Sequence, residues 1–437
     1  MREEKMNKSI WTENVQLPSF EKLEGDIKTD VLVIGGGLCG ILCALRLKEA
    51  GVDFILTEKN RIGSGVTQNT TAKITSQHGL IYAKLLQKRG RETAQKYLFA
   101  NEKAIHAYEK LALHCNFEKK EALTYSLSDR RKIEEEVKAV SSLGLSADFV
   151  ENTELPFPVR GAIRFRNQAC FHPLRFLAEI TGDLPIYEDT LVEELMPGYA
   201  VTSSGKIHFK ACIIATHFPI LNKHGAYFLK LYQHRSYVTA VENAPHFSGM
   251  YVDESMTGFS FRNFDKYLFI GGGDHRTGKK GIGWDSAESV LKKYYPAARR
   301  AFTWATQDCM SLDGLPYIGA YGKHADGLYV ATGFNKWGMT SSMVAADILC
   351  DLVQGKKNEF ADVYSPQRSI LTPQLFVNGI EAVASILTPT KPRCPHMGCA
   401  LKWNKNERTW DCPCHGSRFS AEGKVLDNPS TGNINKS

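Results

Sequence analysis

The sequence predicts an α/β fold, in which a Rossmann-like nucleotide-binding domain carries an inserted antiparallel sheet and precedes a small domain rich in cysteine and histidine. Three observations support this prediction. A short apolar strand runs into a glycine-rich turn at Gly35, apolar and polar residues alternate over 237–270, and cysteines and histidines gather at 394–415. With 437 residues, the chain is long enough for two or three domains.

The first unit has the strand–turn–helix order that a dinucleotide fingerprint requires. Residues 30–40 read DVLVIGGGLCG, and a helical pattern at 41–50 and a second strand at 52–57 follow. The glycines let the backbone approach a pyrophosphate at the helix N-terminus, and an acidic residue after the second strand can bind a ribose hydroxyl. The candidate residues of this unit are Gly35, Gly36, Gly37, Gly40, Glu58 and Lys59.

Two later segments extend this unit. Residues 61–77 are rich in Gly, Ser and Thr, and are either a flexible loop that opens a helix or a segment that wraps the cofactor. Residues 206–216 predict a short strand, a turn and a buried strand. They resemble the second motif of flavoproteins, in which the chain returns to the nucleotide sheet and a glycine follows. His217 stands at that position here, which puts close backbone packing in doubt.

A second glycine-bounded unit lies about 300 residues further along the chain. It contains a strand at 327–331, a turn at 332–340 and a helix at 341–353. The N-terminus of this helix can stabilise negative charge on a reduced flavin ring. A classical NAD dehydrogenase does not need this second unit, so its presence favours FAD as the dinucleotide.

The segment 394–415 contains the motifs CPHMGC and CPCHGS on predicted loops. Two thiolates and two imidazoles that converge on one point describe a Rieske [2Fe–2S] centre. Cysteine and histidine pairs at these spacings are also compatible with a tetrahedral zinc site that includes Cys414.

Both motifs resemble, residue for residue, the loops of Rieske proteins in respiratory cytochrome bc complexes. The resemblance implies that Cys394 and Cys412 bind one iron, and that His396 and His415 bind the other. It also implies a disulfide between Cys399 and Cys414 that braces the two loops.

Residues 11–355 resemble FAD-dependent oxidoreductases related to D-amino-acid and glycine oxidases. The glycine motifs, the segments 70–73 and 168–173 and the turn 337–340 occur in this order in a bacterial branch with a C-terminal Rieske domain. The resemblance implies FAD bound to a GR2-type domain, an antiparallel-sheet substrate domain and a small amine or amino acid as substrate. The further FAD-binding residues that it implies are Thr70, Thr71, Ala72, Lys73, Gly333, Phe334, Lys336, Trp337, Gly338, Met339 and Thr340.

These observations give a predicted domain organisation. An N-terminal extension (1–28) precedes the oxidoreductase (29–355), and a linker (356–390) precedes the cluster domain (391–437). Within the oxidoreductase, the FAD-binding parts are expected at about 29–80, 185–220 and 308–355, and the substrate-domain parts at about 81–184 and 221–307.

Two segments are shorter than the resemblance requires. Residues 176–185 leave little room for a long helix after His172, which we expect to have a structural or capping role. Only 38 residues (356–393) separate the last flavin-domain helix from the first cluster loop. We therefore expect a truncated all-β Rieske domain with weak support around the cluster.

The composition of the chain limits which kinds of partner and which cellular compartment are expected for the protein. The net charge of +7 is scattered, which argues against nucleic acid as a partner. No apolar run approaches 18 residues, so no transmembrane segment is expected. The polar N-terminus, with Met1 or Met6 as its start, and seven widely spaced cysteines outside the cluster motifs favour a reducing cytoplasm.

The principal functional hypothesis is an enzyme that oxidises an amine or amino acid through FAD and passes electrons to the Rieske centre and an external acceptor. His275 and Arg276, which follow three glycines, are candidates to face the substrate, or else belong to a solvated turn. The alternatives are an electron-transfer or redox-sensing protein without an organic substrate, and a flavoenzyme with a degenerate cluster domain.

Overall fold

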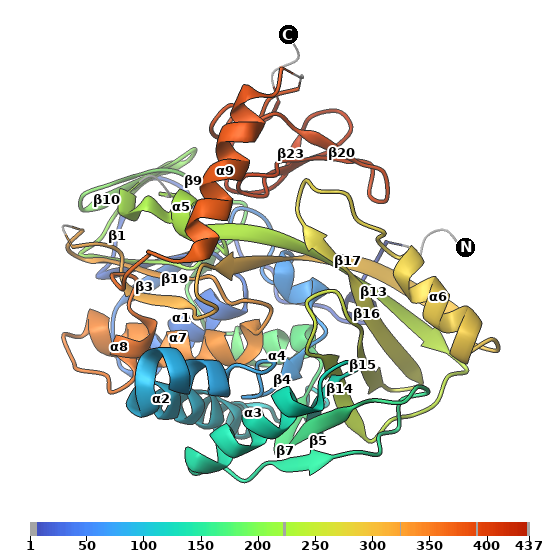
Figure 1. Ribbon diagram of the computed structural model, residues 1–437. Helices are drawn as coiled ribbons and strands as arrows, with labels where there is room; N and C mark the ends of the chain where they lie inside the picture. The colour runs from blue at the N-terminus through green and yellow to red at the C-terminus, as the bar shows by residue number, and fades with distance from the viewer. Residues whose placement is uncertain (1–6, 222–223, 324, 390–391, 435–437) are drawn as a thin grey trace.

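The computed structural model describes residues 7–221, 224–323, 325–389 and 392–434, so both candidate start residues, Met1 and Met6, lie outside it. The predicted α/β architecture is confirmed: a parallel sheet with helices, a large antiparallel sheet beside it and a small C-terminal sheet on top (Figure 1). None of the helices in the described part of the chain combines the length and apolar character needed to span a bilayer.

The nucleotide-binding sheet has six strands in the order β18-β19-β12-β2-β3-β8. Neighbouring strands are parallel except for β18 and β19. The strands are β2 (Val31–Ile34), β3 (Phe54–Thr57), β8 (Ile186–Tyr187), β12 (Ala211–Ile214), β18 (Tyr317–Ala320) and β19 (Leu328–Thr332). Helices α1 (Leu38–Glu49) and α7 (Gly338–Val353) follow β2 and β19 and pack against each other, which brings the two glycine-bounded units together.

The second large sheet has nine strands in the order β17-β13-β16-β15-β14-β5-β7-β4, with β6 beside β7. It is antiparallel except for the parallel pair β5 and β14, which the sequence pattern did not predict. The strands are β4 (Lys73–Ile74), β5 (Glu118–Ser126), β6 (Asp148–Val150), β7 (Gly161–Cys170), β13 (Leu231–Glu242), β14 (Gly249–Asp253), β15 (Ser260–Phe264), β16 (Tyr267–Arg276) and β17 (Arg299–Ser311).

The remaining elements complete the two large domains. A small sheet has the order β1-β11-β10-β9. Its strands are β1 (Ile27–Lys28), β9 (Val192–Met196), β10 (Tyr199–Thr202) and β11 (Gly205–His208), and the helices are α2 (Tyr82–Leu111), α3 (Arg130–Ser142), α4 (Pro173–Ile180), α5 (Tyr227–Lys230) and α6 (Asp285–Tyr294). Helix α4 is as short as expected, and His172 caps it by accepting a hydrogen bond from the Arg175 backbone N–H at 3.3 Å.

Close packing explains the glycines of the first turn. Gly35 has φ of +112°, and a Cβ on it would lie 2.7 Å from the Ala215 carbonyl oxygen, while a Cβ on Gly40 would lie 1.9 Å from the Gly35 carbonyl oxygen. His217 adopts the left-handed conformation (φ 64°) despite its side chain. Its backbone therefore follows the path of the usual glycine, and its ring bonds Gln233 Oε1 at 3.0 Å.

The predicted N-terminal extension packs into the protein. Trp11 is fully buried, and its indole N–H donates to the Thr70 carbonyl oxygen at 2.6 Å. The buried guanidinium of Arg262 donates to the Thr71 and Ala72 carbonyl oxygens at 2.5 and 2.8 Å. These bonds fix the shape of the segment 70–73, which the sequence assigned to the cofactor.

The predicted linker contains two helices, α8 (Ala361–Tyr364) and α9 (Pro373–Leu387), and the described residues of 356–393 contain no strand. The cluster domain beyond them has four short strands in the order β20-β21-β22-β23. They are β20 (Lys402–Asn404), β21 (Thr409–Asp411), β22 (Arg418–Phe419) and β23 (Val425–Asp427). The described part of the domain is thus as short as the sequence predicted.

A buried ion-pair network docks this domain on the large antiparallel sheet. Glu407 lies between Arg235 of β13 and Arg418 of β22, and accepts hydrogen bonds from Arg235 Nε at 2.8 Å and Arg418 Nη2 at 2.8 Å. The hydroxyl of Tyr237 donates to the same carboxylate at 3.1 Å. Although burial opposes ionisation, the two guanidinium groups lower the pKa of Glu407 to about 2.

Other contacts extend the docking surface across the domain boundary. The side chain of Gln307 on β17 donates to the Gly416 carbonyl oxygen at 2.9 Å. The amide of Asn428 donates to the Thr216 and Phe218 carbonyl oxygens at 2.8 Å each. The cluster domain thus contacts both the antiparallel sheet and the end of the nucleotide sheet.

The substitution Glu407→Gln leaves two buried guanidinium groups without this carboxylate, and we expect it to cost about 3 kcal/mol of unfolding free energy at pH 7. Because the folded pKa is about 2 and the ordinary value is 4.5, the contribution is present above pH 4.5 and is lost as the pH falls toward 2. Thermal unfolding at several pH values checks whether the gap between wild type and variant closes over this window.

The control is Glu134→Gln, which breaks an exposed pair with Arg130 on α3. We expect it to change stability by no more than about 0.5 kcal/mol. A gap for Glu407→Gln that is equally small, or that does not depend on pH, would contradict the docking role.

Candidate active site and cluster site

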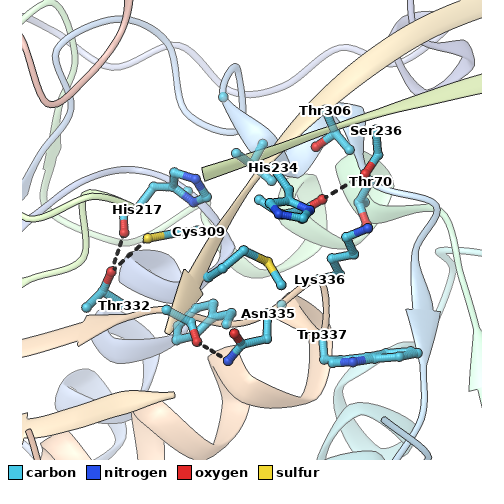
Figure 2. Close-up of a pocket in the computed structure, with 18 of the residues that line it drawn as sticks. Thr70, His217, His234, Ser236, Thr306, Cys309, Thr332, Asn335, Lys336 and Trp337 are labelled. Carbon is cyan, nitrogen blue, oxygen red and sulfur yellow. Dashed lines mark hydrogen bonds between the residues drawn. The ribbon is translucent and has the colours of Figure 1, made fainter. Parts of the chain in front are cut away.

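One cavity of about 1190 Å³ lies between the nucleotide-binding sheet and the large antiparallel sheet. Its lining comes from the glycine turn after β2, the loop after β3, the turn before α7, strands β13, β16 and β17, and residues after β22. Figure 2 shows His234, Ser236 and Thr306 on one side of the space and Lys336 and Trp337 on another. The volume exceeds that of an ordinary small-molecule pocket and suits a dinucleotide together with a substrate.

The nucleotide end of the cavity is braced by side chains. Glu58 accepts the Gly36 backbone N–H at 2.7 Å, which holds the carboxylate against the glycine turn. Thr67 Oγ1 accepts the Leu38 N–H in the first turn of α1 at 3.0 Å. The start of α1, with its positive dipole end, therefore faces the cavity on a fixed loop.

The structure brings most of the predicted FAD-binding residues to this one cavity. Those that line it are Gly35, Gly37, Glu58, Lys59, Thr70, Thr71, Lys73, Gly333, Phe334, Lys336, Trp337, Gly338 and Met339. Gly36, Gly40, Ala72 and Thr340 lie behind the lining. Thr340, for example, donates to the Thr75 carbonyl oxygen at 3.1 Å, so its role is to hold the lining segments in place.

Two basic residues in the cavity are kept from their ordinary charge state by burial. Burial and the nearby Arg262 lower the pKa of Lys73 to about 7. Burial lowers the pKa of His78 to about 3, and its ring stacks on Trp337 with centroids 4.9 Å apart. At neutral pH, the His78 ring is therefore uncharged, whereas Lys73 is divided between its charged and neutral forms.

The turn before α7 is held in an uncommon conformation. Asn335 and Lys336 have φ values of 51° and 73°. Asn335 accepts the Ser311 N–H at 2.8 Å, and Lys336 Nζ pairs with Asp274 at 2.7 Å. The sequence reading passed over Asn335, although asparagine is one of the few residues that tolerates this conformation.

The sheet wall of the cavity was missed by the sequence reading. Alternate residues of β13 point to opposite faces, so Tyr232, His234 and Ser236 line the cavity. The intervening Gln233 and Arg235 contact the cluster domain. From β17, Thr306 and Asp308 join the wall beside their register partners on β13. Strands β13 and β17 thus face the cavity on one side and the cluster domain on the other, and residues 425–428, 430 and 431 of the cluster domain also line the cavity.

The two candidate substrate-facing residues lie in different places. Arg276 lines the cavity, but its guanidinium donates to the Pro413 and Cys414 carbonyl oxygens at 3.2 and 3.3 Å and to Asn378 Oδ1 at 2.9 Å. His275 is not part of the cavity lining, and its Nδ1 lies 3.1 Å from the Gly273 carbonyl oxygen. Arg276 therefore connects the cavity to the second cluster loop.

The four predicted cluster ligands form two close pairs, one of histidines and one of cysteines. The rings of His396 and His415 lie edge to face with centroids 5.0 Å apart. Cys394 is hydrogen-bonded to Cys412, which together with burial raises the pKa of the Cys394 thiol. Nδ1 of His415 is buried without a hydrogen-bond partner, and burial lowers the pKa of this histidine to about 4. A neutral imidazole with an unmatched nitrogen beside two thiols fits a [2Fe–2S] cluster.

The predicted disulfide is not formed in this structure. Cys399 and Cys414 are buried free thiols, and their sulfurs lie with that of Cys412 within 4.8 Å of one another. Hydrogen bonds from Cys399 and Cys412 lower the pKa of Cys414 to about 4. The three thiols form one hydrogen-bonded group in this structure, and the disulfide stays a prediction.

Two family models match the chain. A model described as FAD dependent oxidoreductase matches residues 30–352, and a model described as Rieske [2Fe-2S] domain matches residues 380–437. The first covers more than half of the chain. The second begins inside α9, ahead of the first cluster loop.

Two curated relatives illustrate the similarity in sequence. The putative Rieske 2Fe-2S iron-sulfur protein YhfW of Bacillus subtilis (strain 168) is 31% identical, over 97% of this chain and 96% of the relative. The cytochrome b6-f complex iron-sulfur subunit of Microcystis aeruginosa (strain NIES-843 / IAM M-2473) is 51% identical over 37 residues, which are 8% of this chain and 21% of that protein.

Solved structures share the fold of the larger part. L-proline dehydrogenase from P. horikoshii has a TM-score of 0.66 and 17% identity, over 79% of this chain and 98% of that one. Glycine oxidase from Geobacillus kaustophilus has a TM-score of 0.65 and 18% identity, over 79% and 100%. The protein therefore belongs to the FAD-dependent oxidoreductase family, binds FAD, and carries a C-terminal Rieske domain that binds a [2Fe–2S] cluster.

Proposed function

We propose that the protein oxidises a small amine or amino acid and passes the electrons through its Rieske centre to an external acceptor. The observation that carries this proposal is the shared wall between the two cofactor sites. Strands β13 and β17 line the cavity, and they also supply Gln233, Arg235 and Gln307 to the docking surface. Residues 425–428, 430 and 431 of the cluster domain line the cavity as well, so the two proposed cofactor sites adjoin each other within one chain.

Arg276 connects the cavity to the second cluster loop, which supports electron transfer between the two sites. It lines the cavity, its guanidinium lies 5.1 Å from the centre of the Tyr232 ring, and it donates to two carbonyl groups of the second cluster loop. These carbonyls belong to Pro413 and Cys414, which lie between the proposed ligands Cys412 and His415. The arrangement gives the cavity and the cluster loop a common residue.

Each cofactor has a proposed set of residues. When bound, FAD would accept two electrons from a C–H bond beside an amine nitrogen, and the Rieske centre would accept electrons singly. The glycine turn and Glu58 would hold the nucleotide part, and the start of α7 would favour negative charge on the ring. For the cluster, we propose the ligands Cys394, His396, Cys412 and His415.

We also propose a cytoplasmic location. The seven cysteines outside the cluster motifs are buried and free, which suits a reducing compartment. They are Cys39, Cys43, Cys115, Cys170, Cys212, Cys309 and Cys350.

The substrate proposal predicts that at least one small amine or amino acid bleaches the flavin. The holoenzyme is mixed without oxygen with a panel of primary amines, secondary amines and amino acids, and flavin absorbance is followed. Loss of the oxidised flavin bands, with appearance of the reduced Rieske signal, is the expected result. A wholly negative panel would contradict the proposal and favour electron transfer without an organic substrate.

The ligand proposal predicts that Cys394→Ser and His415→Ala each abolish the Rieske absorbance and EPR signals and most of the bound iron, because each removes a ligand that the cluster requires. Cys115→Ser is the matched control, since this thiol is also buried but lies on the oxidoreductase part. It should retain full iron content. Unchanged iron in the first two variants would rule out the ligand set.

A further inference from the structure

The sheet wall of the cavity is polar where it faces the substrate space. His234 and Ser236 on β13 and Thr306 and Asp308 on β17 all line the cavity. The register pairs His234 with Asp308 and Ser236 with Thr306, so the four residues are neighbours on one face of the sheet, and Figure 2 shows His234, Ser236 and Thr306 on the same side of the cavity. A buried polar patch of this kind requires hydrogen-bond partners.

Asp308 is the charged member of this patch. Within the described residues it forms no ion pair, and Ser236 Oγ donates to it at only 3.4 Å. Burial raises its pKa to about 6, although Lys336 opposes the shift. Its neighbour Asp274, in contrast, is paired with Lys336 at 2.7 Å. One of the two carboxylates of the wall therefore lacks an ion-pair partner among the described residues.

Two further polar atoms of the patch are unmatched. His234 Nδ1 and Thr306 Oγ1 are buried and have no hydrogen-bond partner in the described structure. Burial and the cations Lys336 and Arg276 lower the pKa of His234 to about 3, so its ring is neutral at pH 7. A neutral ring nitrogen, a hydroxyl and a carboxylate can all accept hydrogen bonds.

The two cationic side chains of the wall already have hydrogen-bond or ion-pair partners within the protein. Arg276 donates to two carbonyl oxygens and to Asn378, and Lys336 pairs with Asp274. A carboxylate ligand beside Asp308 would meet a like charge, since the neighbouring cations Lys336 and Arg276 already have partners. A ligand with a positive charge and N–H donors matches Asp308 instead, with the polar groups of His234 and Thr306 beside it.

We infer that His234, Thr306 and Asp308 form a subsite for a protonated amine, and that the substrate class is a cationic amine without a required carboxylate group. This inference rests on the proposed function, which it sharpens from amines and amino acids to cationic amines. Asp308 is the specificity-determining residue, because it supplies the only unmatched charge of the patch among the described residues.

The test uses the holoenzyme and three ligands of equal chain length: butylamine, butyrate and butanol. Isothermal titration measures binding directly, so the result does not depend on turnover. We expect butylamine to bind at least 10-fold more tightly than butyrate and butanol. Tighter binding of butyrate, or binding of none of the three, would overturn the inference.

The substitution Asp308→Asn keeps the shape and removes the charge, and we expect it to weaken butylamine binding at least 10-fold. Asp265→Asn is the matched control, because Asp265 is an exposed carboxylate in the turn between β15 and β16 whose left-handed backbone (φ 50°) suits asparagine. Flavin content verifies that both variants fold. Equal affinity in Asp308→Asn and wild type would overturn the assignment of Asp308.

If Asp308→Asn fails to fold, the comparison of butylamine, butyrate and butanol on the unmodified holoenzyme still tests the inference. Failure of this inference is also distinct from failure of the proposed function. Amine binding that depends on Asp308 without any flavin bleaching would support the subsite and contradict the oxidation. Flavin bleaching by an amino acid whose binding does not depend on Asp308 would support the oxidation and contradict the subsite.

Discussion

The buried carboxylate of Glu407 is the contact on which the arrangement of this protein depends. It joins Arg235 on the substrate-domain sheet to Arg418 in the small cluster domain, and it stays ionised because both guanidinium groups face it. The described part of the cluster domain has only four short strands and therefore little core of its own. Docking on a large, well-packed sheet supplies the support that a truncated barrel lacks.

This docking gives one sheet two functions. Because side chains alternate along β13, His234 and Ser236 face the cavity, while the residues between them hold the cluster domain. The cluster domain therefore adjoins the cavity, through these strands and through its own residues 425–428, 430 and 431, which line it. Arg276 reaches from one side to the other, which explains why it is not available as a simple carboxylate clamp.

Local motifs were predictable because their chemistry depends on neighbouring residues. The turn at Gly35, the loops around Cys394 and Cys412 and the turn at Trp337 all follow from short-range spacing. The wall around Asp308 was not predictable, because it depends on strand register between segments some 70 residues apart and on which face each strand buries. The disulfide was inferred from resemblance alone, and free thiols stand in its place.

The central claim is electron transfer from flavin to cluster within one docked chain. Laser-flash reduction of the bound flavin in the anaerobic holoenzyme, followed by the absorbance of the Rieske centre, measures this step directly. We predict that the cluster is reduced as the flavin is reoxidised, with a rate constant that does not change with protein concentration. A rate proportional to protein concentration, or a cluster that stays oxidised, would contradict the account.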